Sequence, residues 1–300
     1  MNGGDDSAVA HAGGGEIRPP AHAGTFYPAA PEALRRLVDA QLAEAVAARP
    51  GLSWVGFVVP HAGLVYSGPI AAAAWATLAA RPPATIVLAG TNHYVAGLRG
   101  VAIWPDGAWR TPLGDVPVDA AVASRILALG TPFGASPAAH RREHSIEVQL
   151  PFIVRSCPTA EIVPLLVSFE DPRAGLAAGA QLGRLLAGLR DSGHDIALVA
   201  SSDFAHYPPA PDAEAVTRAL LPPLLALDGE ELARREADLR EAGIPGLVCG
   251  MCGIEPVVFA LGAFRAMGLR AGTLLAAGTS ADVPHGDPER TVGYAAIGFA

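Results

Sequence analysis

Three apolar runs of the chain end in side chains that can bind a metal ion or move a proton. His61 follows "VGFVV", His93 follows "TIVLAGTN", and Asp203 and His206 follow "DIALVASS". Neutral imidazole is a common metal ligand, and a neighbouring group can fix its tautomer. A single histidine after a strand is more often a hydrogen-bonded structural residue than a ligand. Three such endings in one chain favour a shared site.

A fourth candidate lies near the end of the chain, in "GLVCGMCGIEPVVFALGAF". Pro256 suits the first turn of a helix. Cys252 is therefore predicted just before a helix N-terminus, where the macrodipole favours the thiolate, which is the metal-binding form. "CGMC" is also compatible with a redox dithiol, and either cysteine could be a small buried hydrophobe. We favour Cys252 as a ligand and leave Cys249 unassigned.

The segment "RREHSIEVQLPFIV" concentrates charged and imidazole side chains ahead of an apolar run. Glu143 and Glu147 are spaced i, i+4, so a helix would present both on one face, and an acidic first turn suits the helix dipole. A solvated helix start is the ordinary interpretation. The alternative is that Glu143 and His144 border the site, with Glu143 or Asp203 as the second partner of a ligand imidazole.

The elements that must position these residues alternate between short β-branched runs and longer helical patterns. The predicted strands are Val55–Val59, Thr85–Ala89, Glu161–Val167, Asp195–Ala200, Gly272–Ala276 and Val292–Phe299. The predicted helices are Pro31–Arg49, Ile70–Ala80, Ala174–Leu189, Ala213–Leu225, Gly229–Glu241 and Pro256–Met267. This alternation predicts an α/β fold with a mostly parallel or mixed sheet flanked by helices. If the strands are parallel neighbours, the side chains after them converge at one sheet edge.

The chain is expected to form one domain. Residues 99–140 are rich in Gly, Pro and Trp and predict a long excursion with short strands such as Gly100–Trp104. We find no repeat and no interdomain linker. The acidic, Gly-rich residues 1–16 predict a disordered tail ahead of a domain over residues 17–300. No signal-peptide pattern and no apolar run of roughly 18 residues is present, so we expect a cytoplasmic protein without a membrane span.

Composition excludes several classes of function. The net charge of −8 argues against nucleic-acid binding, because no basic field exists to collect phosphates. All 21 basic residues are arginine, which rules out a P-loop lysine, a pyridoxal phosphate Schiff base and a lysine nucleophile. No GxSxG elbow is present. Three cysteines in a long chain favour reduced thiols over a disulfide framework.

Taken together, the motifs resemble a known family. "RPPAHAGTFYP", "VVPHAGLVYSGP", "LAGTNHY", "EHSIEVQLPF", "SSDFAHY", "CGIEP" and "TVGYAAIGF" run in order from residue 18 to residue 299. They resemble the MEMO family, the B component of the bacterial AmmeMemoRadiSam system. The fold of that family is similar to class III extradiol dioxygenases of the LigB type. Seven segments in family order make the resemblance specific over nearly the whole chain.

The resemblance implies roles for individual residues. His61, His93 and Cys252 fall on the family's metal-ligand positions, and Asp203 and His206 fall on the pair beside the metal. His206 also occupies the place where extradiol dioxygenases keep an acid/base histidine. We expect Tyr66, Glu143 and His144 to line a substrate pocket rather than to bind the metal. A Cys249–Cys252 disulfide would remove the thiolate ligand.

Two functional hypotheses follow. In the first, the chain is a mononuclear enzyme, with Fe(II) favoured over Zn or Cu, that oxidises a small aromatic substrate. His206, held by Asp203, would move a proton at a substrate hydroxyl. In the second, the chain is a non-catalytic metal- or redox-responsive protein that acts through a partner such as a radical SAM enzyme or an AMMECR1-like component. A Zn hydrolase, with Glu143 or His206 activating water, is a weaker third alternative.

Overall fold

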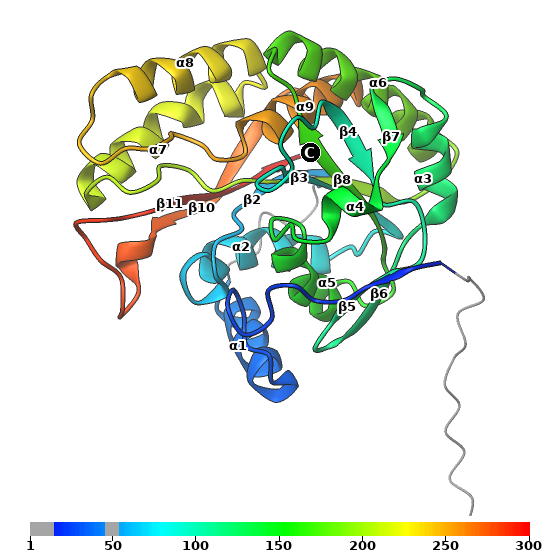
Figure 1. The fold of residues 1–300 in the computed structure, drawn as a ribbon, viewed down its shortest axis with the longest axis horizontal. Helices are drawn as coiled ribbons and strands as arrows, with labels where there is room; N and C mark the ends of the chain where they lie inside the picture. The colour runs from blue at the N-terminus through cyan, green and yellow to red at the C-terminus, as the bar shows by residue number, and fades with distance from the viewer. Residues whose placement is uncertain (1–14, 46–53) are drawn as a thin grey trace, which may run out of the picture.

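The protein is described by a computed structural model that covers residues 15–45 and 54–300 (Figure 1). A large mixed sheet runs through these residues, with the strand order β10-β11-β2-β9-β3-β8-β4-β7. Its strands are β2 (Gly56–Val59), β3 (Thr85–Thr91), β4 (Gly100–Ile103), β7 (Phe133–Ala135), β8 (Glu161–Ser168), β9 (Ile196–Ser201), β10 (Gly272–Thr279) and β11 (Gly293–Phe299). The predicted α/β class with a mixed sheet is confirmed.

The four central strands β2, β9, β3 and β8 are parallel, and antiparallel strands border them on both sides. β2, β3 and β9 are buried along their whole length. Strands covered on both faces need apolar side chains at every position, which is why these runs do not alternate with polar residues. β2, β9 and β3 are parallel neighbours, so the loops after them leave the sheet at the same edge. This is the arrangement in which the sequence predicted that the side chains after these strands converge.

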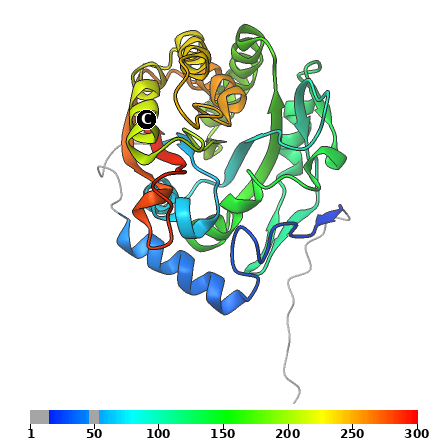
Figure 2. The same ribbon diagram turned by 60° about the vertical axis from the view of Figure 1, so that its left-hand side comes forward.

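Helices cover both faces of this sheet (Figures 1 and 2). Their bounds are α1 (Pro31–Glu44), α2 (Leu64–Ala79), α3 (Ala120–Leu127), α4 (Pro137–His140), α5 (Leu150–Ser156), α6 (Pro172–Asp191), α7 (Ala210–Leu225), α8 (Gly229–Glu241) and α9 (Ile254–Ala266), with short 3-10 turns η1 (Glu147–Gln149) and η2 (Ser280–Asp282). Within the described ranges, no helix is both long and apolar enough to cross a bilayer.

Two hydrophobic cores lie on opposite faces of the sheet. Val58 of β2 packs into a core with α3, α6, α7, α8 and α9, whereas Phe57 and Val59 pack into a core with α1, α2 and α5. Successive side chains of a strand point to opposite faces, so each central strand contributes to both cores in turn. The loops at the strand ends are thus anchored from two sides.

The excursion over residues 99–140 adds strands at two places. β4 and β7 extend the edge of the large sheet, and β5 (Ala108–Thr111) and β6 (Gly114–Pro117) form a small sheet with β1 (Ile17–Arg18). β1 pairs in parallel with β5, which ties the N-terminal segment to the excursion. This small sheet lies beside α5 in Figure 1.

Several predicted boundaries differ from the structure. α2 begins at Leu64 rather than Ile70 and continues through Pro69, although an internal proline removes one helical N–H bond. The first helix ends at Glu44, and residues 46–49 of its predicted range lie outside the described residues. Of the predicted tail, only residues 15–16 are described. Within them, Glu16 pairs with Arg141.

Candidate metal centre

Three donor side chains from distant parts of the chain meet at the carboxyl edge of the sheet. One donor atom each from His61, His93 and Cys252 lies within 4.8 Å of the other two. His61 Nε2 is 3.4 Å from Cys252 Sγ. Nitrogen and sulfur ligands of one tetrahedral ion lie about 3.5 Å apart, given the usual metal–ligand bond lengths. The donor set therefore fits a single ion.

The sheet and α9 place these donors. His61 follows the end of β2 by two residues, and His93 follows the end of β3 by two. Cys252 stands before Gly253, the N-cap of α9, whose backbone N–H donates to Ser202 Oγ at 2.9 Å. A Cβ on Gly253 would lie 2.6 Å from the carbonyl oxygen of Ser201, so only glycine permits this close approach.

Each imidazole of the candidate ligand set has a partner for its Nδ1 nitrogen. His93 Nδ1 lies 2.8 Å from Glu143 Oε1, and the His93 backbone N–H donates to Glu143 Oε2 at 2.9 Å. His61 Nδ1 lies 3.0 Å from Ser201 Oγ. Since the Ser201 hydroxyl donates its proton to the Ser145 carbonyl, it accepts from His61 Nδ1–H. Both rings are thereby set with Nε2 free to bind a cation.

Burial and hydrogen bonding decide the charges of this group. Burial alone would raise the pKa of Glu143, but bonds and charge interactions with His93 and His144 outweigh it and hold that pKa at about 2. Burial lowers the pKa of His61 to about 3, so its imidazole is neutral. An anionic carboxylate therefore lies behind His93, and the His61 imidazole beside it is neutral.

The expected thiolate at Cys252 is not what the metal-free site favours. Burial, followed by the charges of Asp203 and Cys249, raises the pKa of the Cys252 thiol well above its ordinary value. The position before α9 is as predicted, but desolvation of the charged form outweighs the helix macrodipole. Cys252 is thus a neutral thiol until a cation displaces its proton.

Asp203 and His206 lie against the same cluster. Asp203 Oδ1 accepts the backbone N–H of His61 at 2.7 Å and of Ala62 at 3.2 Å, so this carboxylate holds the His61 loop. Its Oδ2 is 4.0 Å from His206 Nε2, which exceeds a hydrogen bond. His206 Nε2 is buried without a hydrogen-bond partner among the described residues. Asp203, His206 and Cys252 form a second close group of donors.

Comparison with known proteins identifies the chain. Residues 18–298 match the family model of the Memo-like proteins. The chain belongs to the Memo-like family. It is 36% identical over 298 residues to a MEMO1 family protein of Methanopyrus kandleri, covering 94% of this chain and 98% of that one. It is 35% identical over 291 residues to one of Methanothermobacter thermautotrophicus, covering 93% and 99%.

One solved structure supports the fold. An uncharacterized protein of Escherichia coli K12 is similar with a TM-score of 0.51 and 19% identity, covering 83% of this chain and all of that chain. At this identity the similarity concerns the fold alone. The resemblance drawn from the seven sequence segments is confirmed at the level of the family.

The Memo-like chain uses Glu143 and Glu147 differently from the predicted helical face. Glu143 precedes η1 and faces His93, whereas Glu147 begins η1 and bonds Arg18 and Tyr27. Both carboxylates are fully buried. Of the two interpretations that the sequence left open, the solvated helix start does not hold, because each carboxylate is buried and bonded to partners from another part of the chain.

Of the remaining predicted pocket residues, His144 contacts the cluster directly. His144 stacks on His93, with ring centroids 4.4 Å apart, and packs against Phe26 at the same separation. Tyr94 Oη lies 3.3 Å from His144 Nδ1. Tyr66 occupies the first turn of α2 and is 37% exposed. His144 thus borders the ligands, and Tyr66 lies in the exposed turn that follows the His61 loop.

A hollow of about 520 Å³ borders the sulfur side of the site in this Memo-like protein. Its lining comes from α8, α9, the loop after β8 and the segment that carries Cys249 and Cys252. Both cysteines are free, and burial raises the pKa of Cys249 to about 12. A ligand in this hollow would approach Cys252 from the side of α8.

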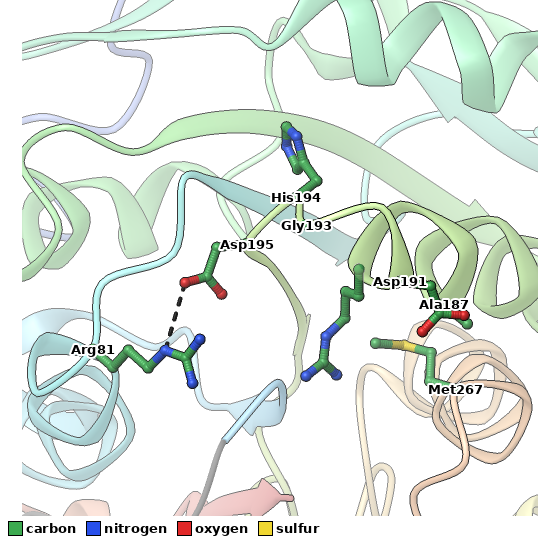
Figure 3. Close-up of a pocket in the computed structure, with 8 residues that line it drawn as sticks. Arg81, Ala187, Asp191, Gly193, His194, Asp195 and Met267 are labelled. Atoms are coloured by element: carbon green, nitrogen blue, oxygen red, sulfur yellow. Dashed lines mark ion pairs between the residues drawn. The ribbon is translucent and has the colours of Figure 1, made fainter.

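A second hollow, of about 410 Å³, lies at the amino ends of β3 and β9 (Figure 3). Arg81 and Asp195 pair across it at 3.6 Å, and His194 lines it. The three predicted metal ligands meet at the opposite, carboxyl ends of these strands, and none of them lines this hollow. This second hollow therefore belongs to a different part of the molecule from the candidate metal centre.

Sequence reasoning missed the groups that orient the ligands. Ser201 and Gln149 were not singled out, yet Gln149 Nε2 donates to both the Pro60 carbonyl and Ser201 Oγ. The signal for Ser201 was present, since it follows a predicted strand directly and stands two residues before Asp203. Gln149 lies inside an apolar run and offered no such signal.

Proposed function

We propose that this protein binds one metal ion through His61, His93 and Cys252 and is an Fe(II)-dependent oxidoreductase acting on a small aromatic substrate. The observation that carries the proposal is the convergence of the three donor atoms within 4.8 Å. Each imidazole already has its other nitrogen bonded. When bound, an ion held by two histidines and one anionic ligand supplies free coordination positions for substrate and O₂.

The chain's own residues would handle the protons. Burial lowers the pKa of His206, so its imidazole is neutral at neutral pH and can accept a proton from a substrate hydroxyl. Asp203 Oδ2, 4.0 Å from His206 Nε2, would stabilise the imidazolium that results. Cys252 must release its thiol proton when it binds a cation. A thiolate donor also suits Zn or Cu, which we retain as alternatives to iron.

Metal content tests the ligand set. We expect Cys252→Ser and His61→Ala to lower metal affinity by at least about tenfold, because each removes one of three protein ligands. Cys249→Ser and Cys157→Ser are matched controls, since they remove sulfurs outside the set. The measurement is metal per chain after anaerobic purification and dialysis against a weak chelator. Equal metal content in all five proteins, including the wild type, would refute the site.

Oxygen uptake tests the catalytic part of the proposal. Iron-reconstituted protein supplied with a panel of catechols should consume O₂, and His206→Asn should abolish consumption while retaining the metal. Loss of both metal and turnover in His206→Asn would instead place His206 among the ligands. Full metal occupancy without turnover on any substrate would favour the second candidate.

The second candidate is a metal- or redox-responsive protein that acts through a partner. The observation in its favour is that exposed apolar and aromatic side chains stand within five residues in sequence of His61, His93, His206 or Cys252; they are Val65, Tyr66, Tyr94, Tyr207 and Val248. Exposed apolar side chains that gather on a surface mark interaction sites. A radical SAM enzyme or an AMMECR1-like component is the kind of partner that we expect. Binding that differs between metal-loaded and metal-free protein would support this candidate.

A further inference from the structure

Arg18 is a completely buried charged residue that no step of the proposed function uses. Its guanidinium lies over the ring of Trp109, 4.1 Å from the centroid. Nη1 donates to Glu147 Oε2 at 2.6 Å, and this ion pair is buried on both sides. A buried charge is costly unless it is paired and hydrogen-bonded. The bonds of the Arg18 guanidinium offset this cost, and they indicate that the guanidinium has a structural role at this position.

The rest of the guanidinium grips the turn that carries Glu143. Nε donates to the His140 carbonyl at 2.9 Å, and Nη2 donates to the Glu143 carbonyl at 2.7 Å. The two bonds bracket residues 140–143 from one planar group. Arginine presents five donors in a fixed fork, whereas lysine offers a single ammonium without that plane.

Glu147 anchors the segment from which Arg18 reaches across. Besides Arg18, its carboxylate accepts the backbone N–H of Ala21 at 3.0 Å and of His22 at 2.8 Å. It also accepts the Tyr27 hydroxyl at 2.6 Å. Residues 18–27 are thereby fastened to η1, so Arg18 has a rigid base.

The bracketed turn ends in the carboxylate that orients a predicted ligand. Glu143 accepts the backbone N–H groups of His93, His144 and Ser145, and also His93 Nδ1. The contacts therefore run without a gap from Arg18, through the backbone of residues 140–143, to the imidazole of His93. Each contact in this series is a hydrogen bond of 2.9 Å or less.

We propose that Arg18 is a positioning residue of the metal centre, which holds Glu143 where its carboxylate fixes the His93 ring with Nε2 free for a cation. The inference rests on the proposed function for the identity of the ligand. It extends that function by assigning the N-terminal segment a role in the site. Arg18 touches neither the donor atoms nor a substrate, and it acts only through Glu143.

The test is Arg18→Lys in the full-length chain, measured in two ways. Long-range ¹H–¹⁵N spectra of the metal-free protein report the His93 tautomer. We expect one tautomer, protonated at Nδ1, in the wild type and a mixture in the variant. Co²⁺ titration should show about tenfold weaker binding, within the range found when groups behind a ligand are changed, and an altered Co²⁺ absorption spectrum.

Two controls separate positioning from general loss of stability. Arg35→Lys makes the same change at an exposed arginine that pairs with Glu32 in α1, so the tautomer and Co²⁺ affinity should match the wild type. Ile126→Val weakens the core far from the site and should likewise change neither readout. If Arg18→Lys does not fold, Arg18→Met combined with Glu147→Gln replaces the ion pair without leaving a lone buried charge, and the same readouts apply.

The outcomes distinguish this inference from the proposed function. An unchanged tautomer together with unchanged Co²⁺ affinity and spectrum in the Arg18 variant would overturn the positioning role. If the wild type binds no Co²⁺ but the His93 tautomer still differs between the wild type and the Arg18 variant, the metal site is refuted and the positioning role is upheld. If the wild type binds Co²⁺, and the Arg18 variant shows a mixture of His93 tautomers and binds Co²⁺ more weakly, both the metal site and the positioning role are supported.

Discussion

The two ligand imidazoles have second partners of different kinds. His93 is bonded to an anionic carboxylate, whereas His61 is bonded to the neutral hydroxyl of Ser201. A carboxylate partner on one ring nitrogen makes the other nitrogen a stronger metal ligand than a hydroxyl partner does. The two imidazoles therefore differ in the group that orients them: a carboxylate for His93 and a hydroxyl for His61.

Burial of a neutral histidine outside the site gives a testable pH dependence. Burial lowers the pKa of His140 to about 3, whereas the unfolded chain titrates near 6.5. Below 6.5 the unfolded state binds a proton that the folded state does not, so stability falls as the pH falls toward 3. The slope from this residue is at most about 1.4 kcal/mol per pH unit.

We therefore expect His140→Gln to flatten the dependence of the unfolding free energy on pH between 6 and 4. Gln is chosen because its amide can replace the bond from His140 Nε2 to the Ala102 carbonyl, which spans 3.2 Å. Urea titrations at each pH, compared with the wild type, measure the difference. Parallel curves for the two proteins would show that His140 does not stay neutral.

At this scale the sequence revealed the groups that do chemistry better than the groups that hold them. A local pattern, a polar residue after an apolar strand, was enough to pick out His61, His93, Asp203 and His206. Arg18 precedes two prolines near the N-terminus, and its role depends on contacts with residues more than a hundred positions away. No local pattern encodes such contacts.

At the scale of elements, α6 and α9 pack with their backbones in contact. A Cβ on Gly183 would lie 2.3 Å from the Ala263 carbonyl oxygen, and one on Gly179 would lie 1.8 Å from that of Phe259. Glycine at these positions of α6 allows α9 to lie closer than any side chain would permit. The position of Cys252, just before α9, depends on that contact.

Gly183→Ala should therefore destabilise the protein by about 1–3 kcal/mol, the usual cost of overpacking. Gly188→Ala is the matched control in the same helix, because its added Cβ meets nothing within 4 Å. We expect the control to stabilise by about 0.5–1 kcal/mol through helix propensity and reduced freedom of the unfolded chain. Thermal unfolding of both variants measures this, and equal shifts would contradict the close packing.

The sequence predicted the type of most long elements and placed the core strands within a few residues. Gly229–Glu241 matches α8 at both ends. The strand order could not be predicted, because an apolar run carries no information about which strand pairs with it. In the structure β9 lies between β2 and β3. The small sheet was also missed, since β1 has only two residues and pairs with a strand far along the chain.

At the scale of the whole molecule, the proposed ligands span most of the chain. His61 and Cys252 are 191 residues apart in sequence and 3.4 Å apart in space. An ion bound there would join the first strand of the parallel core to the last helix. The unfolded chain has no such preformed site, so binding free energy adds directly to folding stability.

Adding metal should therefore raise the melting temperature of the wild type in a concentration-dependent way. The expected stabilisation is about 4 kcal/mol when free metal exceeds the dissociation constant by a thousandfold. Cys252→Ser should show little of this rise, whereas Cys249→Ser should behave like the wild type. Calorimetric scans at increasing metal concentration measure it, and the absence of any shift in the wild type would exclude tight binding.

The insertion of β9 between β2 and β3 has a consequence for synthesis on the ribosome. Both imidazoles leave the exit tunnel early, but the strand that aligns their loops is translated roughly a hundred residues later, and the sulfur follows it. A nascent chain would therefore carry an incomplete form of the proposed metal site for most of its translation. Capture of the proposed ion would be one of the last events in the synthesis of the protein.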